Sequence, residues 1–516
     1  MQVCASPARA IAHAADHVDT PPPSEFSELQ KPLEHFRAKT KRLKIHPTER
    51  LVLGIVGLHV VFLPWAIGGM RPWSQIISVI LASVGFVVAL VPRRYGIEHT
   101  GANEFRLVPW PRLARFPIFW IGLLLLGLVT IQGLNPAWSY FQSERGWWMQ
   151  PIDYVKWLPS GVRVPWEYWG PWRMLTIYAS AWMTVCAIWT GFTRRRTVQI
   201  FFTIVAVNGL LLAGLGLAQK LLPNGKMFWL WEPPVSTFYS SFVYKNHGAS
   251  YLDLTLFVTC GLAAWYYFRG LRRLEKSNPA GLFAFFATCI AIAILVSYAR
   301  GATIVMLVFL TGAIGAFLVH QLVIPNTARK PIVAVMLLII FGLFLKTGLD
   351  TVQSREAWTK LGHGLADDDK SITIRRIATS ASVDMLKDYW SKGAGAGSYR
   401  FLFPKYQIRY PEIFSANGRR MLWEHAHNDI VEFPIEFGVP GTLLILTAAG
   451  YWAAQLLKRY FWESALSACL AFGALILVAY AWWDFPFQNP AVLVLWCSLA
   501  IAIVMWSMFE DLNLKG

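Results

Sequence analysis

The chain has 516 residues, of which 55% are hydrophobic and 15% are charged, and its formal net charge is +17. A soluble protein of this size usually carries about 25% charged residues and lacks apolar runs near 20 residues. Such runs recur here and the basic residues fall mainly between them, so the composition favours one polytopic membrane domain and argues against a nucleic-acid partner.

The first 48 residues are polar and include TPPPSE at 20–25 and the basic RAKTKRLK at 37–44. No apolar core precedes a small-residue cleavage site in this segment, so we expect no cleavable signal peptide. We predict a cytoplasmic, partly disordered tail over 1–48.

Twelve apolar segments follow, each close to the length at which a helix crosses the hydrocarbon core. The sequence therefore predicts an all-α polytopic membrane protein with spans 1–9 within 49–349, a large external loop at 350–429 and spans 10–12 within 430–516. The expected spans are 51–69, 73–91, 116–134, 173–191, 198–219, 249–268, 281–299, 301–323, 331–349, 430–457, 464–484 and 490–509.

Basic residues concentrate at every second connection between these segments. The basic connections are RAKTKRLK, 92–115, 193–196, 269–276, 325–330 and 458–463. The positive-inside rule assigns them to the cytoplasm, together with both chain termini. The alternate connections then face the opposite, external side of the membrane.

The six cysteines form no CxxC pair, and five of them lie in or at the ends of apolar runs. We expect them to pack as small apolar residues, without disulfides or a zinc site.

Two external connections are long. The one at 135–172 holds seven Trp, which suits either a segment at the lipid headgroups or a surface that stacks on sugar rings, and we favour the headgroups. The one at 350–429 contains a predicted helix over 371–390, whose apolar residues share one face. The stretch GAGAGS at 393–398 ends that helix.

Polar residues at the external ends of spans are candidates for substrate binding. Arg300 lies between two apolar runs, where it either snorkels to the interface or holds an anion. Lys245, Asn246 and His247 precede the sixth span, where they either begin a helix or contact phosphate and sugar hydroxyls. The pair Arg375–Arg376 could grip a pyrophosphate or form a solvated helix face.

The stretch WEHAHNDIVEFPIEFGVPGT at 423–442 combines two His with several carboxylates. A metal site is one interpretation, but His425, His427 and Asp429 do not share one helical or extended face. A His that removes a proton from a hydroxyl is the simpler interpretation. The residues that could orient its ring are Glu424, Asp429, Glu432 and Glu436.

This stretch resembles the O-antigen ligase-related family of bacterial envelope glycosyltransferases. The family pattern is a His, then Asn, Ser or Gln, then nine residues and GxxG followed by Thr or a similar residue. Here it reads His427, Asn428, 429–437, GVPG at 438–441 and Thr442. SYARGAT at 297–303, YKNHGASYL at 244–252 and the segment from Arg375 through GAGAGS resemble further family segments. The resemblance covers roughly residues 200–510.

The resemblance implies a GT-C-like fold and a metal-independent, inverting transfer of glycan from an undecaprenyl-pyrophosphate carrier to a hydroxyl, without a cofactor. His427 would be the catalytic base, and Arg300 would bind the donor diphosphate. Arg375 fits the family's loop arginine, with Arg376 as the fallback. The family arginine before the NxNH-like segment is missing, and Lys245 is the nearest basic residue. Asn246, His247 and Asn428 would line the substrate site.

The acceptor separates two versions of this activity. A ligase would use lipid A–core, and a polymerase of O-antigen or exopolysaccharide would use a growing, lipid-linked chain. Transfer to protein is a lesser alternative within the family. A transporter or flippase is the rival from another class, but it would place polar residues near the midplane in two matching halves.

Overall fold

The computed structural model describes residues 44–100, 104–234, 238–273, 277–323, 338–347, 350, 370–414 and 422–514. The chain divides into a small unit, residues 1–44 and 95–105, and a helical unit, residues 45–94 and 106–516. Within the small unit, α4 spans Ile97–Thr100, and the rings of Tyr95 and Phe105 stack with their centroids 4.9 Å apart. Most of the expected tail at 1–48 lies outside the described residues.

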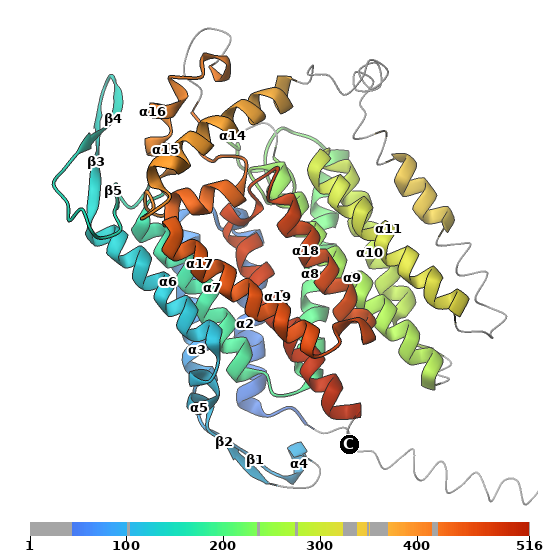
Figure 1. The fold of residues 1–516 in the computed structure, drawn as a ribbon. Helices are drawn as coiled ribbons and strands as arrows, with labels where there is room; N and C mark the ends of the chain where they lie inside the picture. The colour runs from blue at the N-terminus through green and yellow to red at the C-terminus, as the bar shows by residue number, and fades with distance from the viewer. Residues whose placement is uncertain are drawn as a thin grey trace, which may run out of the picture. The chain divides into compact units, whose positions relative to one another are not determined.

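The helical unit consists mainly of long helices (Figure 1). Their bounds are α2 Pro47–Trp65, α3 Pro72–Ala89, α6 Pro117–Leu134, α7 Pro171–Gly191, α8 Arg195–Leu221, α9 Lys245–Arg273, α10 Ala280–Val296, α11 Arg300–Val323, α17 Asp429–Lys458, α18 Ala465–Tyr480 and α19 Pro490–Leu514. Several begin with proline at the first turn, where the missing N–H costs no helical hydrogen bond.

Shorter elements connect these helices. They are the helices α5 Pro109–Ala114, α14 Lys370–Tyr389, α15 Tyr399–Leu402 and α16 Pro404–Gln407, the 3-10 turns η1 Ile67–Gly69, η2 Pro411–Ile413, η3 Phe461–Glu463 and η4 Pro486–Gln488, and the strands β1 Arg93–Tyr95, β2 Phe105–Leu107, β3 Pro136–Ser143, β4 Gly146–Pro151 and β5 Gly161–Arg163.

Within the described part of the chain, eight helices are long and apolar enough to cross a membrane: α2, α3, α6, α7, α8, α11, α17 and α19. Three more expected spans coincide with α9, α10 and α18, the last two of which have 17 and 16 residues. The expected span at 331–349 is described only over the helix Leu338–Thr347. A polytopic helical membrane protein is therefore confirmed, and the count of twelve crossings stays a prediction.

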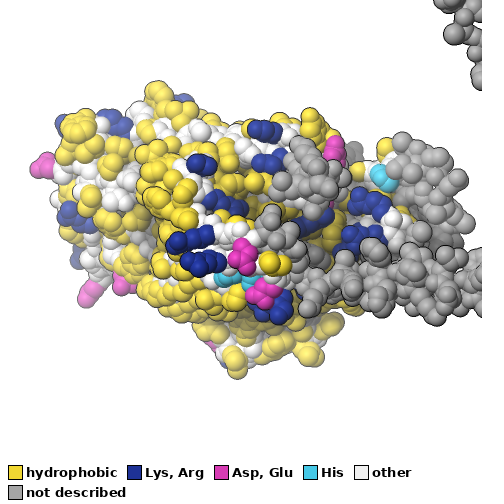
Figure 2. All heavy atoms as spheres, turned by 90° about the horizontal axis from the view of Figure 1, so that it is seen from below, with side chains coloured by type: hydrophobic (Ala, Val, Ile, Leu, Met, Phe, Trp, Pro, Cys, Tyr) yellow, Lys and Arg dark blue, Asp and Glu magenta, His cyan; other side chains and the backbone are white. Residues whose placement is uncertain are grey.

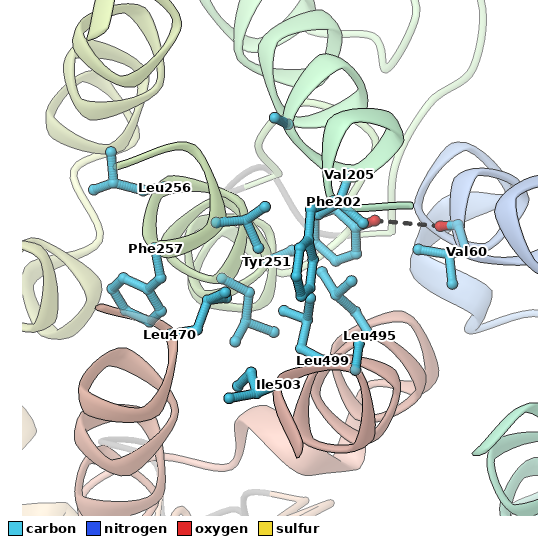
Figure 3. Packing of buried hydrophobic residues seen from close by; sticks show 14 of the residues in the cluster. Val60, Phe202, Val205, Tyr251, Leu256, Phe257, Leu470, Leu495, Leu499 and Ile503 are labelled. Carbon is cyan, nitrogen blue, oxygen red and sulfur yellow. Dashed lines mark hydrogen bonds between the residues drawn. The ribbon is translucent and has the colours of Figure 1, made fainter. Parts of the chain in front are cut away.

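The core of the helical unit lies where α2, α8, α9, α18 and α19 meet (Figure 3). Phe202 of α8, Tyr251 of α9 and Leu499 of α19 are almost fully buried there. The Tyr251 hydroxyl donates to the Val60 carbonyl oxygen at 3.2 Å and accepts from Asn208 Nδ2 at 3.0 Å. These bonds satisfy polar groups that neither lipid nor an apolar core could satisfy.

The connection at 135–172 contains a three-stranded sheet, which the sequence did not predict. Strand β3 pairs with β4 antiparallel and with β5 parallel. Helix α14 confirms the helix expected over 371–390, and its residues Ala381 and Met385 are buried. One apolar cluster joins β3–β5 to α14–α16. Figure 1 shows these elements at one end of the helical unit, where α17 begins.

Basic residues mark the opposite end of the long helices. Helix α9 ends at Arg273 and α17 ends at Lys458, and both ends lie toward the lower side of Figure 1. Viewed from below, this face carries many Lys and Arg side chains among hydrophobic ones (Figure 2). The assignment of this face to the cytoplasm stays a prediction.

Candidate functional site

The candidate site forms where three segments meet around the ring of Phe485. This ring stacks on Tyr244 with a centroid distance of 5.4 Å and on His425 at 4.8 Å. The rings of His247 and His427 are nearly perpendicular to it, with centroid distances of 4.9 Å and 4.6 Å. The segment before α9, the segment before α17 and the α18–α19 connection therefore converge on one aromatic ring.

His427 lies in the loop before α17, in the left-handed backbone region with φ 53°. Its Nδ1 faces Asp484 Oδ1 at 4.0 Å, and the edge of its ring contacts Trp423. Burial and, to a lesser extent, the Arg375 charge lower the pKa of His427 to about 3, against the opposing effect of the Asp484 charge. The imidazole is therefore neutral near pH 7 and has a lone pair that can accept a proton.

Asp484 is a site residue that the sequence reasoning missed. Its Oδ2 accepts from Asn246 Nδ2 at 2.7 Å and from the Tyr480 hydroxyl at 2.5 Å. Its Oδ1 accepts from the Phe485 backbone N–H at 2.9 Å. These bonds fix the carboxylate beside His427. The available signal was a lone Asp in WWDFPFQNP, between two apolar runs and close to prolines.

The carboxylates expected to orient His427 contact other groups. Glu432 accepts from His425 Nδ1 at 2.8 Å and from the Ala426 N–H at 2.6 Å. Asp429 Oδ2 accepts from the Phe487 N–H at 2.9 Å. Glu436 Oε1 accepts from the Tyr399 N–H at 3.3 Å. The three carboxylates hold the loops around the site, and Asp484 is the carboxylate that approaches His427.

Two of the polar residues that were expected to line the substrate site contact the protein backbone. Asn428 is the N-cap of α17, because its Oδ1 accepts from the Val431 N–H at 3.1 Å. His247 Nε2 lies 3.2 Å from the Phe485 carbonyl oxygen. Both therefore help to fix the backbone on either side of the site.

The two arginines of α14 differ in their surroundings. Arg375 is half-buried and forms a hydrogen bond with the Tyr244 hydroxyl. Its positive charge lowers the pKa of His427. Burial raises the pKa of Tyr244, so its hydroxyl stays protonated. Arg376 is exposed. The structure thus brings Arg375 to the candidate base.

Arg300 and Lys245 belong to a second group of cations. Lys245 Nζ donates to the Tyr298 carbonyl oxygen at 2.9 Å, and Lys220 Nζ lies 5.8 Å from the Tyr298 ring centroid. The positive charges of Lys220 and Arg300 both act on Lys245. Because Lys245 directly precedes Asn246, this group adjoins the residues that hold Asp484. Lys220 was not predicted.

Arg400 of α15 is a further cation that the sequence reasoning missed. Its Nη1 lies 3.5 Å from Glu424 Oε1, and its guanidinium lies 5.7 Å from the ring centroid of Trp169. Burial lowers the pKa of Arg400, while Glu424 and Glu432 oppose that shift. The positive charge of Arg400 also lowers the pKa of His425. Arg400 therefore lies on the side of the site where α17 begins.

The two glycine-rich stretches pack against each other. Gly438 has φ 62° and ψ −168°, which kinks α17 after its first nine residues. At this kink the Ala394 N–H donates to the Ile435 carbonyl at 2.7 Å, and the Val439 N–H donates to the Trp390 carbonyl at 2.7 Å. A Cβ on Gly438 would lie 2.5 Å from the Gly393 nitrogen. Glycine is therefore needed where the loop after α14 meets α17.

A segment of the chain matches a known protein family. Residues 283–446 match the family model described as O-antigen ligase. The matched segment includes Arg300, Arg375 and the His427–Gly441 stretch, and it ends before Asp484. No curated protein matches the chain.

Proposed function

We propose that this chain, which belongs to the O-antigen ligase-related family through residues 283–446, transfers a glycan from an undecaprenyl-pyrophosphate carrier to the hydroxyl of lipid A–core. The observation that carries the proposal is the position of His427, whose Nδ1 lies 4.0 Å from Asp484 Oδ1 and whose ring is close enough to Arg375 for that charge to lower its pKa. A general base next to cations is what transfer from a lipid diphosphate to a hydroxyl requires.

The proposed step forms one bond and breaks one. His427 Nε2 accepts the proton of the acceptor hydroxyl, because Nδ1 faces Asp484. The acceptor oxygen attacks the anomeric carbon, and the bond from that carbon to the diphosphate oxygen breaks with its electron pair. The diphosphate leaves on the carrier lipid. Attack opposite the leaving group inverts the anomeric carbon.

The cations are proposed to neutralise the leaving diphosphate. Arg375 lies beside the base, and its planar guanidinium matches phosphate oxygens. Lys245, Arg300 and Lys220 supply a second concentration of positive charge. The hydrogen bond between Asn246 and Asp484 links the two groups. Asn428 and His247 have structural roles in this scheme.

The donor is also proposed to activate the base. A His with a pKa of about 3 binds protons weakly in the free protein. A bound diphosphate would offset the Arg375 charge that contributes to this low value, and its own negative charge favours the imidazolium. The basicity of His427 would therefore rise when the donor is in place.

The proposed location is the bacterial inner membrane, with the site facing the periplasm and both termini in the cytoplasm. Its support is that α17 begins at the site and ends among the basic residues of the opposite face (Figure 1). A polytopic chain with cationic helix ends usually keeps them in the cytoplasm.

The second candidate is a polymerase of O-antigen or exopolysaccharide, which shares the base, the cations and the donor. A strain that lacks this chain separates the two activities. Long polymer that stays on the carrier lipid supports the ligase, and single repeat units on the carrier support the polymerase. Unchanged envelope polysaccharide contradicts both. The wild-type chain supplied on a plasmid is the control.

A further inference from the structure

Four arginines come together where α8 begins and α9 ends. Arg195 is the first residue of α8, and its guanidinium lies 4.3 Å from the ring centroid of Trp506. The last two turns of α9 supply Arg269, Arg272 and Arg273, and the positive charges of all three act on Arg195. These four residues form an arginine cluster at the end of the helical unit that lies opposite the candidate site.

The positive charge of the arginine cluster is only partly balanced. Glu510 of α19 pairs with Arg195. Arg272 and Arg273 are exposed, and within the described part of the chain neither forms an ion pair with a carboxylate. Arg195 also lies at the N-terminal end of α8, where the helix dipole is positive and a cation is unfavourable. An anion at this place would offset both the mutual repulsion of the guanidinium groups and the dipole.

Two buried indole rings position part of the cluster. The rings of Trp265 and Trp506 meet at 82° with their centroids 5.3 Å apart. The Arg195 guanidinium lies 5.2 Å from the Trp265 centroid, and the Arg269 guanidinium lies 5.3 Å from the same ring. Cation–π contacts of this kind hold a guanidinium in place. A ligand of the cluster therefore meets charges that are already ordered, which lowers the entropy cost of binding.

The arginine cluster has about the depth of a lipid headgroup layer. One helical turn separates Arg269 from Arg273, which is about 5.4 Å along the helix axis. The headgroup layer on each side of a bilayer is about 5–8 Å thick. Helix α8, whose first residue is Arg195, is apolar and long enough to cross a membrane. When α8 spans the hydrocarbon core, the guanidinium groups therefore lie at the level of the lipid phosphates.

Exposed apolar side chains accompany the arginines. Leu271 is 41% exposed. Helix α10 packs on the end of α9, where the rings of Phe283 and Tyr266 stack with centroids 5.5 Å apart, and its first turns leave Leu282 and Phe285 more than half exposed. Figure 2 shows Lys and Arg side chains among hydrophobic ones on this face. A soluble anion gains nothing from such apolar neighbours, whereas the acyl chains of a lipid contact them.

We propose that the arginine cluster binds the phosphate head group of an anionic phospholipid, whose acyl chains contact the apolar start of α10. Guanidinium groups match phosphate oxygens in pairs, and basic pockets between membrane-crossing helices suit anionic head groups. The bound lipid would hold the ends of α8 and α9 together against the repulsion of their arginines. This site lies at the opposite end of α9 from Asn246 and the candidate base, so it does not depend on the proposed function.

Phosphatidylglycerol is the probe, and native mass spectrometry of the purified full-length protein in detergent measures its dissociation constant. The double variant Arg272→Gln/Arg273→Gln is expected to bind the lipid at least about tenfold more weakly, because charge-assisted hydrogen bonds to phosphate are lost. The matched control Arg94→Gln/Lys458→Gln removes two exposed positive charges of the same basic face outside the cluster, and it is expected to stay within about threefold of wild type. Phosphatidylcholine, which is neutral overall, is expected to bind all three proteins equally weakly.

Equal affinity of the cluster variant and wild type for phosphatidylglycerol overturns the proposal. An equal loss in the cluster variant and the control also overturns it, because only the net charge of the face would then matter. Glycerol phosphate carries the phosphate without acyl chains and is expected not to displace the lipid; displacement would overturn the lipid as the occupant. Phosphatidylglycerol should also raise the melting midpoint of wild type more than that of the cluster variant, and an equal rise counts against the site.

Discussion

Replacing Asp484 by Asn tests whether this carboxylate supports the base. Asn is nearly isosteric, so the loop at 482–489 keeps its shape, but the negative charge 4.0 Å from His427 Nδ1 disappears. One acceptor oxygen is also lost, because Asn246 and Tyr480 both donate to Oδ2 of the acid. His427 then becomes less basic, since the Asp484 charge raises its pKa.

The expected magnitude follows from Coulomb's law. Two unit charges 4 Å apart interact by about 1 kcal/mol in water and about 4 kcal/mol at an effective dielectric constant of 20. The pair is 23% and 3% exposed, which places it between these limits. We expect a loss of about 2 to 3 kcal/mol in transition-state stabilisation, or roughly 30- to 150-fold in kcat.

The assay is glycan transfer by purified protein in nanodiscs with saturating lipid-linked donor. Asp388→Asn is the matched control, because Asp388 accepts a hydrogen bond from the Tyr406 hydroxyl at 2.6 Å and has no role in the proposed chemistry. A loss of less than about threefold in Asp484→Asn, or an equal loss in both variants, would refute the role given to Asp484.

Four further predictions concern the base, the arginines and the kink. The low pKa of His427 in the free protein predicts a kcat/KM that is flat from pH 7.5 to 5. As the pH is lowered, kcat is expected to begin its fall at a higher pH than kcat/KM does, because bound donor makes the imidazole more basic. The contribution of His427 to thermal stability, measured as the difference in melting midpoint between wild type and His427→Gln, should fall as pH drops from 6.5 toward 3, because the unfolded chain then binds an additional proton at this ring; a difference that rises would contradict the burial of His427. Arg375→Ala should lower kcat/KM for donor by about 10- to 100-fold, against less than threefold for Arg376→Ala, as measured by transfer kinetics; equal effects would refute the assignment. Gly438→Ala should destabilise the fold by about 2 kcal/mol or more, seen as a lower melting midpoint, because alanine rarely adopts that backbone conformation; an unchanged midpoint would contradict the strained kink.

The long helices were predictable, because an apolar run that is long enough to cross a membrane can adopt few structures other than a helix. The helix over 371–390 was equally visible, since its apolar residues repeat at helical spacing and the glycines after it end it. Sequence spacing also singled out His427, and the structure brings Arg375 to it. These features depend on residues that are close in the chain or on a pattern with fixed spacing.

Features that depend on contacts between distant segments were not predictable. Asp484 follows His427 by 57 residues, and nothing in the sequence pairs them until α17, α18 and α19 pack together. Glu432 was expected to orient His427, but it follows His425 by seven residues and bonds that ring instead. The sheet at 136–163 was not predicted, because β5 pairs with β3 only across the segment that follows β4, and no sequence spacing indicates that pairing.

The central claim is that His427 is the base, and chemical rescue tests it most directly. Transfer to the acceptor hydroxyl is measured with purified wild-type protein and with His427→Ala, each with and without added imidazole. We predict that the variant loses at least about 100-fold in kcat, within the range typical of general bases, and that imidazole restores part of the rate. The rescued rate should grow with the concentration of neutral imidazole. Transfer at the wild-type rate by His427→Ala would contradict the account.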